Sequence, residues 1–313
     1  MATLPRSRSF AVAHACPHCG CGDPRLLRAT DRNRAVSDCH FEYAACRSCG
    51  VIWLPDVPDD LGDYYPAGYH ASFAPADLDA AVAAEARRLK LVTRYVGPGR
   101  MTEIGPSRGV FSRAATAAGF EVTALEMDAD CCAYLEREVG IRTIQTAEPA
   151  RVLTTLAPSR VVVMWHVIEH LPDPWDVLRA VAGHLEPGGV LALATPNPRS
   201  LQARALGARW AHLDAPRHLT LIPLDVLRAA ADEVGLQLLS ATTTDEVGLG
   251  LNRLGWERSL LSPPAMRPDA RLAHTVGKVL TGSARAWEER GMRGAAYTAV
   301  LRRRDDGAAP ASR

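Results

Sequence analysis

From about residue 76 onward, short apolar segments alternate with longer segments of helical periodicity. The expected strands are 100–104, 121–126, 142–145, 160–165, 190–195, 237–243 and 296–301. The expected helices are 77–96, 109–118, 128–139, 148–156, 172–186 and 224–234. Between 243 and 296 the pattern is irregular or helical. Short apolar strands separated by helices are typical of an α/β fold with a doubly wound, mainly parallel sheet.

The composition excludes several classes of protein. The 313 residues hold 36 Lys and Arg against 35 Asp and Glu, a net charge of +1, which argues against a protein steered by polyanions. No apolar run reaches the roughly 18 residues that span a membrane. The N-terminus lacks the apolar core of about 7 to 15 residues that a signal peptide needs. We therefore expect a cytoplasmic protein whose cysteines stay reduced.

Six of the eight cysteines lie within the first 49 residues. Four of them form two C-x-x-C knuckles separated by 26 residues: Cys16, Cys19, Cys46 and Cys49. Two such knuckles suit one tetrahedral Zn²⁺, and four thiolates leave no open position, so the ion is expected to be structural. Cys21 and Cys39 are alternative ligands.

The cysteine pattern and the composition divide the chain into five segments. These are a flexible tail (1–14), a zinc ribbon (15–54), a connector rich in Tyr and Pro (55–75), the main α/β domain (76–303) and a second flexible tail (304–313). The sequence does not indicate an oligomeric state.

A glycine-containing loop follows the first strand of the main domain. Gly105 and Gly109 let the backbone approach a ligand at a helix N-terminus. Glu126 ends the second strand, where a carboxylate can accept hydrogen bonds from both ribose hydroxyls. Alone, this loop predicts either a nucleotide site or a tight turn.

With these residues, the chain resembles the class I S-adenosylmethionine (SAM)-dependent methyltransferases of the ubiquinone type, with a zinc ribbon at the N-terminus. Their first motif, E/D-x-G-x-G-x-G, is matched except at Ser107. The resemblance implies the strand order 3-2-1-4-5-7-6, with strand 7 antiparallel and formed by 296–301. It implies SAM as cofactor, held by Glu103, Gly105, Ser107, Gly109, Glu126, Met127, Glu148 and Trp165. The resemblance further implies that the loop wraps the methionine half of SAM and that Glu126 holds the ribose. Met127 would lie against the adenine ring, and Glu148 would cap the edge of that ring.

Two histidines and a glutamate follow the fourth strand: His166, Glu169 and His170. In an open parallel sheet, ligands bind outside the carboxyl ends of the strands, where these residues would project. The segment resembles the V-x-E-H-L-x-D-P stretch of the ubiquinone-type methyltransferases. Their E-x-x-E-H run can hold a divalent metal such as Mg²⁺, and here His166 replaces the first glutamate. The alternative without a metal uses His166 or His170 as general base.

The segment 210–219 resembles a family segment that folds over the substrate. It supplies His218 as a further base candidate, with Arg217 or Asp214 as substrate contacts. In the alternative, His218 only caps the helix that begins at residue 224. Three connector tyrosines either close over SAM or, as we favour, pack the ribbon against the domain: Tyr64, Tyr65 and Tyr69.

These features favour a methyltransferase that acts on a small-molecule acceptor, such as a sugar, a quinol-like ring or an intermediate of secondary metabolism, with a histidine as general base. One alternative is an RNA methyltransferase that uses the ribbon to grip nucleic acid. The near-zero net charge argues against it. The other alternative is a scaffold that binds SAM without turnover.

Overall fold

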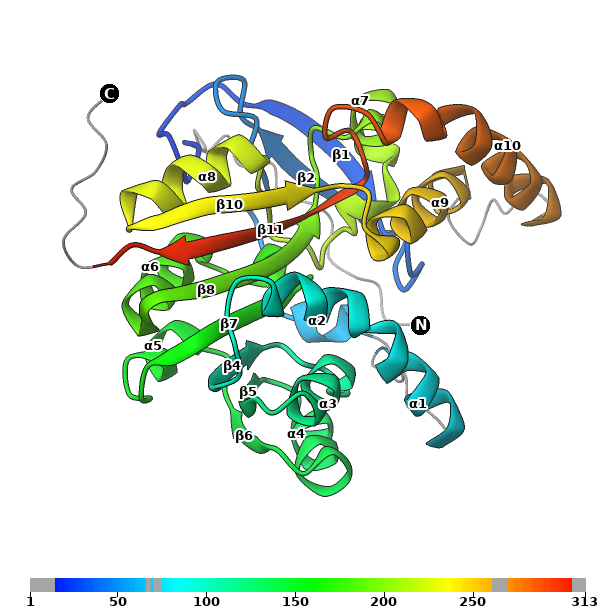
Figure 1. Cartoon of the computed structure of the whole chain (residues 1–313). Helices are drawn as coiled ribbons and strands as arrows, with labels where there is room; N and C mark the ends of the chain where they lie inside the picture. Colours follow the sequence, from blue (N-terminus) through cyan, green and yellow to red (C-terminus); the bar gives the residue numbers. More distant parts are fainter. Residues whose placement is uncertain (1–14, 66–68, 70–74, 261–269, 306–313) are drawn as a thin grey trace.

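The computed structural model describes residues 15–65, 69, 75–260 and 270–305 and contains two sheets (Figure 1). The predicted tail 1–14 and most of the predicted tail 304–313 lie outside these residues. No helix within the described ranges is long and apolar enough to cross a membrane.

The larger sheet has seven strands in the order β10-β11-β8-β7-β4-β5-β6. Their bounds are β4 (Arg100–Ile104), β5 (Glu121–Glu126), β6 (Arg142–Gln145), β7 (Ser159–Trp165), β8 (Leu185–Pro196), β10 (Leu236–Thr242) and β11 (Ala296–Arg303). Only β11 runs antiparallel to its two neighbours. Numbered from β4, this order is 3-2-1-4-5-7-6, which confirms the predicted fold. The central strand β7 is apolar on both faces because helices cover both.

Ten α-helices occupy the described ranges. They are α1 (Pro75–Ala84), α2 (Ala86–Thr93), α3 (Val110–Ala117), α4 (Ala129–Tyr134), α5 (Pro149–Leu153), α6 (Pro174–His184), α7 (Leu201–Leu206), α8 (Leu224–Glu233), α9 (Glu246–Leu260) and α10 (Ala270–Glu288). The predicted helix 77–96 is divided at Glu85, which pairs with Arg88 at the start of α2. The predicted helix 128–139 ends in a π-helical turn, Leu135–Val139. The stretch that the sequence left open contains α9 and α10, which pack against each other.

The smaller sheet combines the ribbon with a strand from far along the chain. β1 (Arg25–Thr30), β2 (His40–Ala45) and β3 (Ile52–Trp53) are antiparallel, and β9 (Thr220–Leu221) adds to β3. The sheet packs on its own apolar cluster, which joins ribbon residues to residues of the 210–221 segment. The ribbon sheet is thus completed by a strand that lies between α7 and α8.

A buried ion-pair cluster also joins the ribbon to the main domain. Arg217 is fully buried, and its guanidinium binds the carboxylates of Asp31 and Asp214, at 2.5 and 2.7 Å for Nη2. Its Nη1 also donates to the carbonyl of Tyr64 at 2.9 Å. The guanidinium group is thus fully engaged in hydrogen bonds within the protein. The structure therefore does not support Arg217 as a substrate contact.

Candidate active site

The glycine loop lies beside the exit of β7, because β4 and β7 are adjacent parallel strands. Gly105 has φ +66°, and a Cβ added there would lie 2.6 Å from Cγ2 of Val167. Gly109 has φ +68° at the start of α3, and its added Cβ would collide with Leu135. Ser107, at the position of the family's middle glycine, has φ +54°. A positive φ explains why glycine is usual there.

The carboxylate of Glu126 ties the loop to the end of β5. It is buried and accepts hydrogen bonds from the backbone N–H groups of Ser107 (2.9 Å), Met127 (2.8 Å) and Asp128 (3.0 Å). Met127 beside it is 69% exposed. A fixed carboxylate next to an exposed apolar side chain fits a ribose and an adenine ring, so these residues suit SAM.

The other predicted cofactor residues differ in their surroundings. Glu103 is buried and accepts a hydrogen bond from the Ser112 hydroxyl. The Trp165 ring meets Phe111 edge-on at 5.2 Å, and its buried Nε1 has no hydrogen-bond partner within the described ranges. Glu148 is exposed at the start of α5.

Glu103 makes the stability of the fold depend on pH. Burial raises its pKa from 4.5 to about 7, against the opposing hydrogen bond from Ser112. Between these values the unfolded chain has lost the proton that the folded chain keeps, so stability falls as pH rises. Glu103→Gln lacks this titration. We therefore expect its free energy of unfolding, measured relative to that of the wild type, to increase by about 2 kcal/mol when the pH is raised from 5 to 7.5.

Urea denaturation at both pH values measures this difference. Glu121→Gln, at the exposed opposite end of the neighbouring strand, is the matched control and is expected to show no such change. A Glu103→Gln variant whose stability relative to wild type is the same at both pH values would contradict the prediction.

Glu169 lies beside His166 at the exit of β7. Glu169 is fully buried, accepts a hydrogen bond from the Thr195 hydroxyl (3.0 Å) and has its second oxygen 3.5 Å from Nδ1 of His166. Although burial opposes ionisation, His166 and the neighbouring histidines lower the pKa of Glu169 to about 2. His166 has φ +58°, a strained conformation for a residue other than glycine. Nε2 of His166 is buried and has no hydrogen-bond partner in the described part of the chain.

His170 and His218 lie next to each other, with ring centroids 4.7 Å apart. Nδ1 of His170 lies 3.0 Å from the Arg217 carbonyl, and Nδ1 of His218 lies 2.9 Å from the His212 carbonyl. A carbonyl only accepts, so each Nδ1 carries a hydrogen and donates it. His218 does not cap α8, whose start has no side-chain cap.

Glu169, His170 and His218 offer ligand atoms within 4.8 Å of one another. The set contains one carboxylate oxygen and two imidazole nitrogens, whereas Mg²⁺ prefers oxygen ligands in an octahedral arrangement. The Mg²⁺ expected at Glu169 and His170 therefore does not fit these donors.

Connector and backbone contacts link the histidines to the ribbon. The Tyr65 hydroxyl lies 3.1 Å from Nδ1 of His170, and the N–H of Leu219 donates to the carbonyl of Glu169 at 2.7 Å. Leu219 in turn accepts from the N–H of Leu54 at 2.9 Å. The contact of Tyr65 with His170 and the hydrogen bond of Thr195 with Glu169 are not evident from the sequence. Their positions, in the tyrosine-rich connector and at the end of a strand, were the available signals.

The four knuckle cysteines form a compact cluster. Sγ of Cys19 lies 3.5 Å from Cys46 and 3.6 Å from Cys49, and Cys16 lies 3.6 Å from Cys49. Four thiolates about 2.3 Å from a tetrahedral Zn²⁺ would be separated by about 3.8 Å, so the donor set fits this ion. Cys21 and Cys39 are not part of the cluster.

A seven-stranded sheet in this order, with a glycine loop after its first strand, defines the Rossmann-like fold of the class I methyltransferases. Residues 77–241 match the family model described as a methyltransferase domain, which covers more than half of the chain. The chain belongs to this family of SAM-dependent methyltransferases.

Curated relatives include ubiquinone biosynthesis O-methyltransferases. The one from Bordetella bronchiseptica is 30% identical over 150 residues, which are 44% of this chain and 62% of that protein. The one from Caulobacter sp. is 36% identical over 114 residues, which are 34% of this chain and 44% of that protein. The chain thus spans less than two thirds of the length of these relatives.

Among solved structures, a SAM-dependent methyltransferase from Archaeoglobus fulgidus aligns with a TM-score of 0.47 and 16% identity, over 71% of this chain and 94% of that one. A sarcosine dimethylglycine methyltransferase from Galdieria sulphuraria aligns with a TM-score of 0.48 and 14% identity, over 73% and 86%.

Proposed function

We propose that the protein transfers a methyl group from SAM to a hydroxyl group of a small-molecule acceptor, with His166 as general base. The observation that carries this proposal is the chain of contacts from Thr195 through the buried Glu169 to His166. The curated relatives are named O-methyltransferases, which supports a hydroxyl as the acceptor group.

His166 is the best base among the three histidines. The carboxylate behind its Nδ1 stabilises the imidazolium that forms when Nε2 takes a proton. Burial and the neighbouring His170 instead lower the pKa of His218 to about 4, so His218 is a weaker base. Nδ1 of His170 contacts the Tyr65 hydroxyl and the Arg217 carbonyl, whereas Nδ1 of His166 faces the Glu169 carboxylate.

When bound, SAM supplies an electrophilic methyl group. The loop from Gly105 to Gly109 and the carboxylate of Glu126 would hold the cofactor at the carboxyl ends of β4 and β5. His166 would take the proton of the acceptor hydroxyl, while Glu169 keeps the ring oriented. His170 and His218 would line the acceptor side. Catalysis then rests on alignment and proton removal.

The test of SAM binding is the substitution Glu126→Ala. Loss of a charged acceptor for the ribose hydroxyls should weaken SAM binding at least tenfold, measured by calorimetry on the full chain. Glu121→Ala, at the exposed end of the same strand, is the control. Unchanged affinity in Glu126→Ala would contradict the site. Methyl transfer from labelled SAM to a panel of small catechols and hydroxybenzoates then tests the acceptor group.

The four cysteines near the N-terminus are proposed to bind one structural Zn²⁺. The segment they belong to is short, and the metal would supply much of its folding free energy. We expect about one zinc ion per chain by atomic absorption, lost in Cys46→Ser and retained in Cys21→Ser. A folded ribbon without zinc would contradict this. Thiols that bind metal fit the reducing cytoplasm that we propose as the location.

A further inference from the structure

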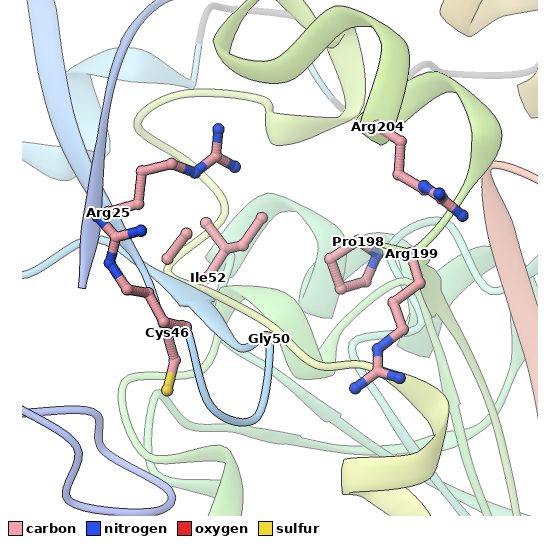
Figure 2. A pocket seen from close by; sticks show the side chains of 9 residues that line it. Arg25, Cys46, Gly50, Ile52, Pro198, Arg199 and Arg204 are labelled. Carbon is pink, nitrogen blue, oxygen red and sulfur yellow. The ribbon is translucent and has the colours of Figure 1, made fainter. Parts of the chain in front are cut away.

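A cavity of about 350 Å³ lies between the ribbon and the chain that follows β8 (Figure 2). Four arginines line it, and no acidic residue is among the described residues of its wall. They come from β1, from the turn after β2, from the loop after β8 and from α7: Arg25, Arg47, Arg199 and Arg204. Figure 2 shows Arg25 on one side and Arg199 and Arg204 on the other.

Two of these arginines are already neutralised. Arg47 pairs with Asp23 at 3.5 Å, and Arg199 pairs with Asp225 at 2.9 Å. Arg25 and Arg204 form no ion pair with any described residue. The cavity therefore carries a surplus of about two positive charges. This surplus matches a phosphate group, whose charge is about −2 at neutral pH, better than a single carboxylate.

A smaller recess of about 110 Å³ adjoins the cavity and shares Arg25, Arg204 and the apolar Ile52 with it. Trp210 also lines this recess. Its side chain is 2% exposed, and its Nε1 has no hydrogen-bond partner among the described residues. The recess therefore has an apolar wall next to the two arginines, which suits the organic part of a ligand.

We propose that the cavity binds a small organic phosphate. Its phosphate or diphosphate group lies between Arg25 and Arg204, and its organic part enters the recess beside Trp210. The combined volume suits a small molecule. Its walls come from the ribbon and from the methyltransferase domain, so the site exists only while the two are docked.

Calorimetry on the full chain at low salt tests the proposal, with inorganic pyrophosphate and a nucleoside diphosphate as probes. We expect saturable binding at one site, weakened at least tenfold in Arg25→Ala/Arg204→Ala. The control Arg28→Ala/Arg228→Ala removes the same charge from exposed positions outside the cavity and should stay within twofold of wild type. Trp210→Phe should weaken the nucleoside diphosphate more than pyrophosphate.

We expect the circular dichroism spectrum and the SAM affinity to be unchanged in these variants, which would show that any loss of phosphate affinity is local. Three outcomes would overturn the proposal. In the first, the wild type binds neither probe in a saturable way. In the second, the control variant loses as much affinity as the cavity variant. In the third, an RNA oligomer binds more tightly than the nucleoside diphosphate and loses equal affinity in both double variants, which would indicate a general polyanion-binding surface.

Discussion

Replacing Arg217 with methionine will lower the free energy of unfolding by about 3 to 5 kcal/mol. Arg217 is fully buried between Asp31 of the ribbon and Asp214 of the main domain. The neighbouring His218, together with the hydrogen bonds and charge of Arg217, holds the pKa of Asp214 well below its usual range, although burial alone would raise it. Without the guanidinium, two carboxylates stay buried without a counter-charge, and this is the source of the loss.

Urea denaturation measures the effect, with Arg47→Met as the matched control. Arg47 also pairs with an aspartate, but that pair is exposed, so its loss should change stability by no more than about 1 kcal/mol. The triple variant Arg217→Met/Asp31→Asn/Asp214→Asn removes all three charges and should recover part of the stability. A loss in Arg217→Met as small as that in the control would show that the cluster does not join the two parts.

Replacing His166 with glutamine is expected to lower kcat about 10²- to 10⁴-fold while SAM affinity stays within twofold. The proton of the acceptor would then have no base held by Glu169. His166→Asn is a second variant, because asparagine tolerates the positive φ at this position better than most residues. His40→Gln, on the exposed side of β2, is the control.

Steady-state methyl transfer across a range of pH distinguishes His166 from its neighbours. Removal of the base should abolish the acidic limb of the kcat profile, whereas His170→Gln and His218→Gln should retain it at reduced rate. A His166→Gln enzyme that keeps the wild-type pH profile, while His170→Gln loses it, would assign the base to His170 instead.

Most of the main sheet could be predicted from sequence because its strands are local signals. Segments 100–104, 121–126 and 142–145 coincide with β4, β5 and β6, since each is a short apolar or β-branched run between turn residues. The pairing of β9 with β3 could not be predicted. β9 has two residues, too few for periodicity, and its partner lies far away in the sequence.

Contacts between residues that are distant in the sequence also limit how much of the candidate active site could be predicted. The sequence places Glu169 and the histidines together because they share one strand exit or a resemblance. It does not show which nitrogen of each ring holds the hydrogen, since that depends on backbone carbonyls such as those of Arg217 and His212. Nor does it show that Arg217 pairs with Asp31, 186 residues away. Both depend on contacts that form only in the folded chain.

The position of β9 has a consequence for how the molecule unfolds. Hydrogen bonds run from Leu54 in the ribbon to Leu219 and from Leu219 to Glu169. Peeling the ribbon away would expose the backbone edge of β9 and release the peptide group that fixes the glutamate. The ribbon and the methyltransferase should therefore melt in one cooperative transition, and cleavage in the connector would not yield two intact halves.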